Sequence, residues 1–430
     1  MKRSLYLSLV AAGLLLVAAA GPAAKADSRD GAAVWTQLGP MGGNIVALAR
    51  HTKAPSKIYA LTGSSPGQFF RSADNGTNWK RMAIFQDTTY DIAVDPNNGD
   101  IVYVLSYSGL YKSANTGDSF AEIRFPDGIC GNGRMAVRPD NSNILYVAGT
   151  FRADNKGCLA FIKSANGGQT WTAIKFDTVA AYSTCVGIAV SPKNPNTVYF
   201  CGHFYDGKSR SCSRVYRSRN GGNAWENITG PDLNQIYKTP SGLAVDPTNA
   251  DRVFVAYNDG VLRSTNGGTT WLNQNSSSFY AGPVAVDPNQ VNTLYAPSGS
   301  LNDLGVYKST DGGINWKKYP KGVYGYANTI IIEGSTIQVG TSAGIFRSKN
   351  GGASYQAAQR GIKATWISTF ALSASSPRTI YAEACDYSHF KSTDGGASWM
   401  KGIDFYRCHS IMNFAVHPGK PNTVSILAGG

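Results

Sequence analysis

An eight-residue motif that recurs along the chain constrains its fold more than any other feature. The motif reads Ser-x-(Asp/Asn)-x-Gly-x-x-aromatic and occurs eight times in 430 residues. Successive copies begin 41, 51, 54, 46, 45, 39 and 44 residues apart, close to the length of a four-stranded propeller blade. Such a period predicts a repeat architecture in which each copy belongs to one supersecondary unit. The copies begin at Ser72, Ser113, Ser164, Ser218, Ser264, Ser309, Ser348 and Ser392, and a degenerate ninth copy begins at Ser28.

Each repeat has the same order of short strands and turns. It opens with an apolar run that ends in proline, as in Asp91–Pro96 and Gly242–Pro247; proline cannot donate to a β-ladder, so it ends the strand in a turn. A second strand rich in Val, Ile and Tyr follows, and a third runs into the motif. Since no helical period appears, we predict an all-β fold, a single β-propeller over residues 27–430.

The number of blades follows from the repeats and the two termini. Eight repeats are complete, Ala33–Gly39 has the pattern of a fourth strand, and Ile411–Val416 and Thr423–Leu427 have the pattern of first and second strands. We predict that these segments join in a composite ninth blade that closes the ring. An eight-bladed ring with strands left over is the alternative, because propellers typically have four to eight blades.

The third residue of the motif is expected to cap its own turn. An Asp or Asn side chain can accept hydrogen bonds from nearby backbone N–H groups, the Gly allows a positive φ, and the final aromatic can pack under the hairpin. Asn in five of the eight copies would make a poor acid and a poor ligand for a hard metal ion. The capping residues are Asp74, Asn115, Asn166, Asn220, Asn266, Asp311, Asn350 and Asp394.

The N-terminus predicts export. Lys2 and Arg3 precede the apolar run Leu5–Ala20, and Ala24-Lys25-Ala26 has the pattern of a cleavage site. We therefore predict a signal peptide over residues 1–26, cleavage after Ala26, and a secreted, periplasmic or cell-surface protein. The run is short for a membrane span, and no other segment is long and apolar enough to be one.

The mature chain is expected to be basic. Removal of residues 1–26 takes away three basic residues, so the net charge falls from +13 to +10. This charge favours an anionic glycan or protein partner, although a generally solvated basic surface explains it as well. Nucleic acid is not an expected partner, because no recognition-helix or zinc-finger pattern occurs.

Seven cysteines follow the predicted signal peptide, and in an exported chain they indicate disulfides with one thiol left over. We predict the bridges Cys385–Cys408 and Cys130–Cys158. A third bridge is expected among Cys185, Cys201 and Cys212, with its pairing open. No C-x-x-C spacing indicates a metal or redox site.

The octapeptides resemble Asp-boxes, also called BNR repeats, over essentially the whole mature chain. The Asp-box propeller superfamily includes sialidases, xyloglucan-active glycoside hydrolases, sortilin-type receptors and photosystem II assembly factors. The resemblance implies a β-propeller in which the Asp-boxes are structural turns away from the active site. It does not imply one function, because unrelated activities share this scaffold.

Catalytic signatures of these relatives are missing from the chain. The Phe/Tyr-Arg-Ile-Pro start of sialidases does not occur, and Phe70-Arg71-Ser72-Ala73 simply enters a motif copy. Xyloglucanase-like enzymes carry a catalytic Asp on an Arg-Thr-Asp-Val-Gly-Gly-type segment, whereas the corresponding Ala60–Ser72 has no carboxylate. Separate loops could still bring acids together. The candidates for such a set are Glu383, Asp386 and Asp404. The five histidines lack close metal-ligand spacing, so neither a metal nor another cofactor is predicted.

Antiparallel strands place alternate turns on opposite faces of a propeller. One face carries the Asp-boxes; the other, the loop-rich face, carries the second-to-third loops and the blade connections, with many aromatics that include Tyr280. We expect a monomeric binding scaffold whose loop-rich face engages a glycan or protein partner. A hydrolase or lyase with a non-standard site and an envelope-complex assembly factor are the alternatives. The candidate ligand-binding residues are Phe204, Tyr205, Arg210, Tyr237, Tyr326 and Trp366.

Overall fold

The computed structural model describes residues 42–429 except 52, 154–155, 181, 206–210, 232–237, 273–278, 320–321, 361, 363–366, 374, 377, 385–388, 402–409, 418–419 and 421. The described residues form antiparallel β-sheets and one 3-10 turn, η1 (Leu301–Asp303), so the all-β prediction is confirmed. The chain divides into two compact units, one of them Gly43–Ile362 and the other including residues 363–430. The predicted signal peptide, its cleavage site and the motif copy at Ser28 lie outside the described residues.

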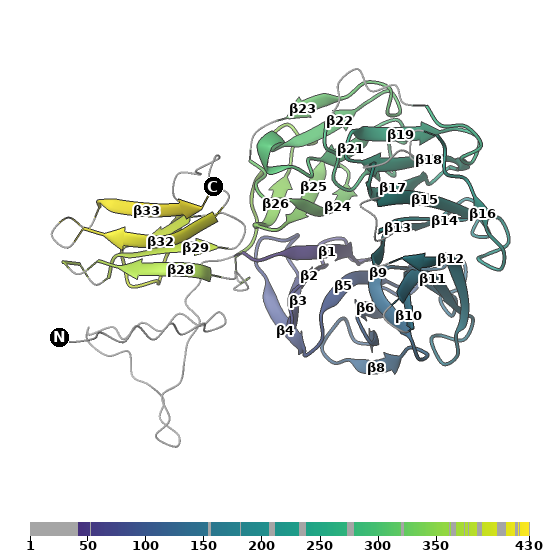
Figure 1. The fold of residues 1–430 in the computed structure, drawn as a ribbon, viewed down its shortest axis with the longest axis horizontal. Coiled ribbons are helices and arrows are strands. Elements are labelled where there is room, and N and C mark those ends of the chain that lie inside the picture. Colours follow the sequence, from purple (N-terminus) through teal and green to yellow (C-terminus); the bar gives the residue numbers. More distant parts are fainter. Residues whose placement is uncertain are drawn as a thin grey trace. The chain divides into compact units, whose positions relative to one another are not determined.

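Seven sheets make up Gly43–Ile362, and we number them as blades 1 to 7 in chain order (Figure 1). Blades 1 to 3 consist of β1 (Ile45–Arg50), β2 (Ile58–Thr62), β3 (Gly67–Ser72) and β4 (Lys80–Phe85); β5 (Thr89–Val94), β6 (Val102–Ser106), β7 (Gly109–Ser113) and β8 (Ala121–Arg124); and β9 (Ile129–Val137), β10 (Leu145–Ala153), β11 (Lys156–Ser164) and β12 (Thr172–Ala180). Blades 4 and 5 consist of β13 (Tyr182–Val190), β14 (Val198–Tyr205), β15 (Ser211–Ser218) and β16 (Glu226–Asn227); and β17 (Pro240–Asp246), β18 (Asn249–Tyr257) and β19 (Gly260–Ser264). Blades 6 and 7 consist of β20 (Ala285–Val286), β21 (Leu294–Pro297), β22 (Val306–Ser309) and β23 (Lys317–Tyr319); and β24 (Ala327–Glu333), β25 (Thr336–Thr341), β26 (Gly344–Ser348) and β27 (Gln356–Ala357).

The first strands of the seven blades pack against one another in a closed cycle. Strand β1 packs on β5, β5 on β9, β9 on β13, β13 on β17, β17 on β20, β20 on β24, and β24 back on β1. The ring is therefore complete within Gly43–Ile362. The predicted nine-bladed ring with a composite last blade is wrong, and so is its eight-bladed alternative. Repeat counting failed because closure depends on which blades meet in space and not on how many repeats the chain contains.

The junction between blades 7 and 1 shows how the ring closes. The indole Nε1 of Trp79 donates to the carbonyl of Ala358 at 2.8 Å, and its backbone N–H donates to the carbonyl of Arg360. The amide of Gln338 donates to the carbonyl of Asn75 at 2.9 Å. Nearer the channel, the amide of Asn328 donates to the carbonyl of Ile45 at 3.0 Å. The two ends of the ring are thus joined by side-chain hydrogen bonds and by one isolated parallel β-bridge between Asn78 and Arg360.

Each Asp-box is a turn held by its own polar side chains. In the first copy, the Ser72 hydroxyl donates to Asp74 Oδ1 at 2.8 Å and accepts from the N–H of Gly76 at 2.9 Å. Asp74 Oδ1 also accepts from the N–H groups of Thr77 and Asn78 at 3.0 and 2.8 Å. In the second copy Asn115 accepts from its turn in the same way. Gly76 has φ +78°, a conformation that favours glycine.

The side chain at the motif's seventh position forms a hydrogen bond with the capping side chain at the third position in the first, second and sixth copies. Asp74 accepts from the amide of Asn78 at 2.6 Å, whereas the amide of Asn115 donates to the hydroxyl of Ser119 at 2.9 Å. Asp311 with Asn315 follows the first pattern. An ionised carboxylate only accepts and an amide can donate, so in these copies the capping residue is paired with a side chain of the opposite hydrogen-bonding sense. The fourth copy is an exception, because its seventh residue is Ala224.

These turns predict a specific sensitivity to acid. Hydrogen bonds from Ser398 and Ser392 lower the pKa of Asp394 to about 2. At Asp74 partial burial raises the pKa, but hydrogen bonds from Asn78, Ser72 and Thr77 outweigh this effect and lower the pKa to about 2. An Asp whose pKa is lower in the folded than in the unfolded protein stabilises the fold at pH values above its unfolded pKa of ~3.9. This stabilisation is lost as the pH falls towards 2. We expect Asp74→Asn with Asn78→Ser, which copies the second motif, to melt with less acid dependence between pH 5 and 2. An unchanged pH profile would contradict this assignment.

A basic residue just before the motif's Ser connects most blades to the next. At six of the seven junctions this Arg or Lys donates to the Asp-box of the following blade. In this way Arg347 of blade 7 donates to the carbonyl of Asn75 in blade 1. The donors in blades 1 and 3 to 6 are Arg71, Lys163, Arg217, Arg263 and Lys308, and their acceptors are Thr116, Asn223, Gly267, Gly312 and Gly351. Part of the chain's positive charge thus serves structural contacts.

The second unit contains the eighth motif copy. It has a four-stranded sheet, β28 (Ile367–Leu372), β29 (Ile380–Ala384), β30 (His389–Ser392) and β31 (Met400–Lys401), and a two-stranded one, β32 (Ser410–Val416) and β33 (Val424–Gly429). Strand β28 packs against β32 as first strands do in the ring. These strands are among those expected to complete the ring, but they form a unit of their own.

The predicted Cys130–Cys158 bridge does not form, and the Cys130 thiol is free. Cys130 pairs with Thr150 of β10, whereas Cys158 pairs with the next residue, Phe151. Adjacent strand residues point to opposite sheet faces, so the two cysteines face apart. Cys185 and Cys201 are buried and also free. Cys212 pairs through its backbone in β15, but its side chain, Cys385 and Cys408 lie outside the described residues.

Candidate functional site

The strand order confirms that the ring has two different faces. The first-to-second turns and the Asp-boxes lie on one side, which we call the Asp-box face. The second-to-third loops and the starts of the first strands lie on the loop-rich face. Each face is a candidate site, because the first strands end around a cavity on the Asp-box face and the longer loops lie on the loop-rich face.

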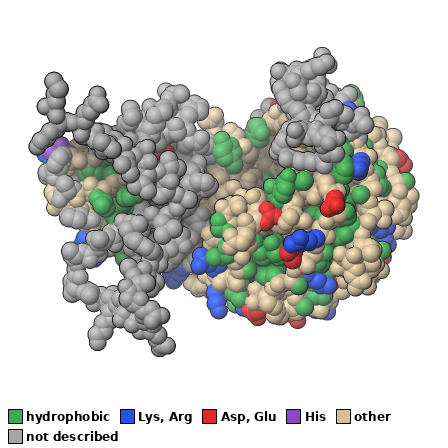
Figure 2. Space-filling model, turned by 60° about the horizontal axis from the view of Figure 1, so that its bottom comes forward, with side chains coloured by type: hydrophobic (Ala, Val, Ile, Leu, Met, Phe, Trp, Pro, Cys, Tyr) green, Lys and Arg blue, Asp and Glu red, His purple; other side chains and the backbone are tan. Residues whose placement is uncertain are grey.

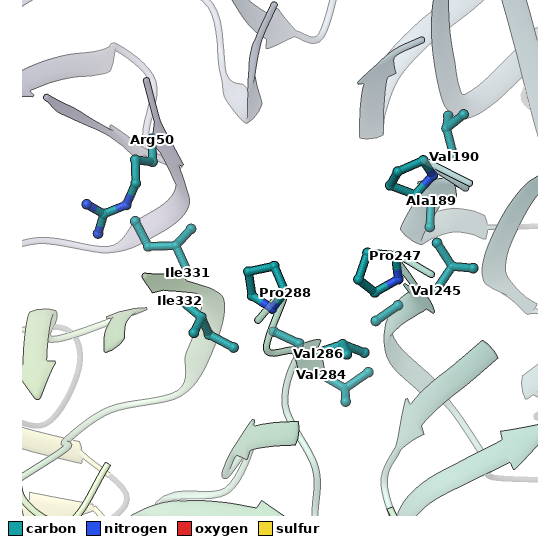
Figure 3. Close-up of a pocket in the computed structure, with 13 residues that line it drawn as sticks. Arg50, Ala189, Val190, Val245, Pro247, Val284, Val286, Pro288, Ile331 and Ile332 are labelled. Carbon is teal, nitrogen blue, oxygen red and sulfur yellow. The ribbon is translucent and has the colours of Figure 1, made fainter. Parts of the chain in front are cut away.

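The mouth on the Asp-box face is a cavity of about 440 Å³ with an apolar lining (Figure 3). Its walls come from the ends of the first strands of blades 4 to 7 and include Pro192, Pro247 and Pro288. The one charged lining residue, Arg50, donates to Asn75 Oδ1 at 3.1 Å and to the carbonyl of Pro55 in blade 1, and its Nε lies 3.8 Å from the carboxylate of Glu333 in blade 7. This mouth offers little hydrogen bonding to a sugar.

Two charged side chains, Asp91 of β5 and Arg134 of β9, connect the first strands of blades 2 and 3 by bonding to each other's backbone. Arg134 Nη1 donates to the carbonyl of Tyr90 at 2.9 Å, and Asp91 Oδ2 accepts from the N–H of Met135 at 2.9 Å. Burial raises the pKa of Asp91, and the nearby Arg134 partly offsets that rise. Asp91 directly follows a β-bulge in β5, which places its carboxylate against the next blade. The pair could not be predicted from the sequence, because DIAVDP has the pattern of a simple strand. We assign it a structural role.

The loop-rich face presents two exposed tyrosines at equivalent positions in adjacent blades. Tyr280 is 42% exposed and Tyr326 is 45% exposed. Each precedes the alanine that begins the first strand's pairing, Ala281 opposite Ser298 in blade 6 and Ala327 opposite Thr341 in blade 7. Tyr326 is one of the predicted ligand-binding residues, and the structure places it on the predicted face.

Polar groups lie close to Tyr280. The loop Ser298–Asp303 contains η1, and Asp303 accepts from the hydroxyl of Tyr307 at 2.6 Å and forms an ion pair with Lys318. Both charged side chains are about one-third exposed, at 32% and 33%. The phenol of Tyr307 is no nucleophile, because burial and the neighbouring Asp303 raise its pKa and its ring stacks on Phe279 at 3.8 Å.

The other predicted site residues are described only in part. Phe204 and Tyr205 end β14 opposite Cys212 and Ser211, which places their backbone at the loop-rich end of blade 4. Glu383 is 2% exposed and pairs with Thr369 and His389 across its sheet, so it is too buried for a surface acid. Arg210, Tyr237, Trp366, Asp386 and Asp404 lie outside the described residues.

The Ala60–Ser72 hairpin, where the resemblance would place a catalytic Asp, is occupied by its own hydrogen bonds. Thr62 Oγ1 accepts from the N–H of Gln68 at 3.0 Å, and Ser64 donates to the carbonyl of Pro66 at 2.9 Å. The neighbouring carboxylate of Asp87 accepts from the N–H and the hydroxyl of Ser108. The hairpin itself therefore provides no carboxylate, and the neighbouring Asp87 is bonded to Ser108.

Charge does not mark a site on the surface seen in Figure 2. Basic and acidic side chains alternate with apolar ones over the visible part of the ring. No group of His, Cys, Asp and Glu that could hold a metal ion occurs among the described residues. Nor do these residues include a helix able to cross a membrane.

Comparison with known proteins agrees with the turn geometry. The Sortilin-Vps10 family model (Sortilin, neurotensin receptor 3) matches residues 67–212, and the BNR/Asp-box repeat model matches residues 307–318. The chain belongs to the Asp-box β-propeller superfamily. This Asp-box propeller is 27% identical to a xyloglucanase of Hypocrea jecorina over 276 residues, 53% of this chain and 32% of that protein. It is 31% identical to a xyloglucanase of Paenibacillus sp over 401 residues, 77% of this chain and 38% of that protein.

Solved structures show the same fold. A GH74 enzyme of Niastella koreensis superposes with a TM-score of 0.62 at 18% identity, covering 92% of this chain and 71% of that one. YCF48 from Cyanidioschyzon merolae superposes with a TM-score of 0.50 at 15% identity, covering 74% of this chain and 98% of that one. The Asp-box propeller spans about a third of the length of the curated xyloglucanases that it matches.

Proposed function

We propose that this Asp-box propeller is an exported glycan-binding protein that binds a neutral, xyloglucan-like polysaccharide on its loop-rich face without cleaving it. The observation that carries the proposal is the pair of exposed tyrosines, Tyr280 and Tyr326, on that face. The similarity to xyloglucanases over 77% of the chain supports the ligand class. The carboxylate-free hairpin at Ala60–Ser72 supports binding without hydrolysis.

The charges of the ring favour a neutral ligand over an acidic one. On the loop-rich face Lys238 pairs with Asp259 and Lys318 with Asp303. Elsewhere, basic side chains such as Arg217 and Arg347 donate to Asp-box carbonyls. These four cations already have partners within the ring, so they are not available to bind an anionic ligand.

Hydrolysis is the second candidate function, and the names of the relatives favour it. It would need two carboxylates that flank a bound sugar. Asp386 and Asp404 are the remaining sequence candidates, and they stay predictions. The same purified protein can distinguish the two functions.

We expect the full chain to be retarded in gels that contain xyloglucan and not in gels that contain polygalacturonate, an acidic control. Incubation with xyloglucan should release no reducing ends, because the hairpin provides no acid. Retardation together with steady release of reducing ends would establish the second candidate instead. Equal migration in every gel would remove glycan binding altogether.

A further inference from the structure

Tyr280 and Tyr326 are held in place by the same backbone contacts in their two blades. The N–H of Gly299 donates to the carbonyl of Tyr280 at 2.9 Å, and the N–H of Ser342 donates to the carbonyl of Tyr326 at 2.9 Å. The Ser342 hydroxyl also accepts from the N–H of Tyr326 at 3.0 Å. Each tyrosine is thus fixed to the second-to-third loop of its own blade, and ordering its side chain on binding involves only two torsions.

The two positions lie on either side of one tight junction. A Cβ added to Gly282, two residues after Tyr280, would lie 3.3 Å from the Cβ of Ala327, the residue after Tyr326. The Tyr280 ring rests directly on a glycine, because a Cβ at Gly299 would lie 2.7 Å from its Cδ1. Gly299 therefore leaves room for the ring in its present orientation.

The surroundings suit a ligand with apolar ring faces and neutral polar edges. Tyrosine rings exposed by more than 40% offer aromatic faces to solvent. Asp303, in the loop beside Tyr280, accepts from the Tyr307 hydroxyl of β22 and forms an ion pair with Lys318 of β23, so these polar groups already have partners. A pyranose matches this pattern, because its axial C–H face is apolar and its hydroxyls can both donate and accept.

We propose that Tyr280 and Tyr326 form one stacking platform, which holds two sugar rings of a β-linked glucan backbone across the junction of blades 6 and 7. This inference rests on the proposed function and adds the site and the part of the polymer that is bound. The extended glucan backbone is the occupant, since two faces repeated by the blade symmetry match a chain that repeats its own ring. Side-chain sugars of a branched polymer then point away from the platform.

The test measures binding of cello-oligosaccharides and xyloglucan oligosaccharides to the full chain by calorimetry and by tyrosine fluorescence. Tyr280→Ala and Tyr326→Ala should each weaken binding by about tenfold, and the double variant by about a hundredfold. Tyr→Phe at either position should bind like the wild type, because the ring face and not the hydroxyl makes the contact. Melting temperatures should not move, since both side chains are exposed.

Three further variants show whether the two tyrosine rings themselves bind the glucan. Gly299→Val keeps both tyrosines but displaces the Tyr280 ring, so it should weaken binding nearly as much as Tyr280→Ala. Ile84→Ala removes a 47% exposed apolar side chain from β4 and should change nothing. The double variant Phe204→Ala, Tyr205→Ala tests the loop predicted from the sequence.

The outcomes are distinct. If the wild type binds and the tyrosine double variant binds equally well, the platform is wrong while the proposed function stands. Loss of binding only in the Phe204, Tyr205 variant would move the site to blade 4 and also overturn the platform. If the wild type binds no glucan at all, both the function and the platform fail, and a protein becomes the expected partner of this face.

Discussion

Replacing Trp79 with alanine is expected to lower the free energy of unfolding by about 3–5 kcal/mol, the usual range for a buried tryptophan. Trp79 is 5% exposed, and its indole N–H reaches the Ala358 carbonyl of blade 7. The substitution removes core contacts and leaves that carbonyl without its partner at the junction that closes the ring. Urea unfolding of the full chain, followed by tryptophan fluorescence and circular dichroism, measures the loss.

A control variant and a double-mutant cycle test the prediction for the junction between blades 7 and 1. Leu272→Ala removes a 43% exposed side chain and should leave stability unchanged. Arg347→Ala and Thr77→Ala should show a coupling energy of about 0.5 kcal/mol or more, because Arg347 Nη1 lies 3.0 Å from Thr77 Oγ1. In a nine-bladed ring blades 1 and 7 would not touch, so strictly additive effects would refute closure at seven.

Removing Arg134 should destabilise the ring by about 1.5–3 kcal/mol at pH 7, because its charged guanidinium donates to the carbonyl of Tyr90 and favours the ionised form of the nearby Asp91. The Arg134→Ala variant also loses the hydrogen bond to the carbonyl of Tyr90. Asp91 still accepts from the N–H groups of Ile92 and Met135, so the turn itself should survive. Chemical denaturation at several pH values measures the effect.

The pH dependence of this variant has a definite sign. Burial raises the pKa of Asp91 in the folded protein. An Asp whose pKa is higher in the folded than in the unfolded protein contributes to stability most fully below its unfolded pKa of ~3.9. This contribution is lost as the pH rises through the pKa of the folded state. Without Arg134 the folded pKa rises further, so the variant should regain part of its lost stability between pH 7 and 5. Arg124→Ala, which removes an 83% exposed cation paired with Glu122, serves as the control.

The local structure of each blade could be predicted from the sequence because its causes are local. The Asp-box turn forms from a hydroxyl, a carboxylate or amide, and a glycine within eight residues, and Ser72, Asp74 and Gly76 make these contacts among themselves. The order of strands follows from such turns. Blade number depends on contacts between Asn75 and Gln338, more than 260 residues apart, and no repeat pattern contains that information.

The candidate site was predictable only in part, for a related reason. Tyr326 could be assigned to the loop-rich face because it precedes a strand whose direction was known. Its partnership with Tyr280 depends on the packing of blade 6 against blade 7, which brings Gly282 to Ala327. The Cys130–Cys158 prediction failed because side chains alternate between the two faces of a sheet. A shift of one residue in strand pairing is enough to turn a cysteine to the opposite face.

Gln338 distinguishes blade 7 from the other blades of the ring, which are similar to one another. Blades 1 to 4 and 6 have a tyrosine at the corresponding point of the second strand, as at Tyr59, Tyr146 and Tyr295, whereas blade 7 has a fully buried glutamine. Its amide donates to the carbonyl of Asn75, and a Cβ at Gly76 would lie 2.6 Å from its Nε2. A ring of similar blades can add further blades until one blade packs better against the first blade than against another copy. In this chain Gln338 is one of the side chains that join blade 7 to blade 1, so the residues at this last junction help to set the number of blades.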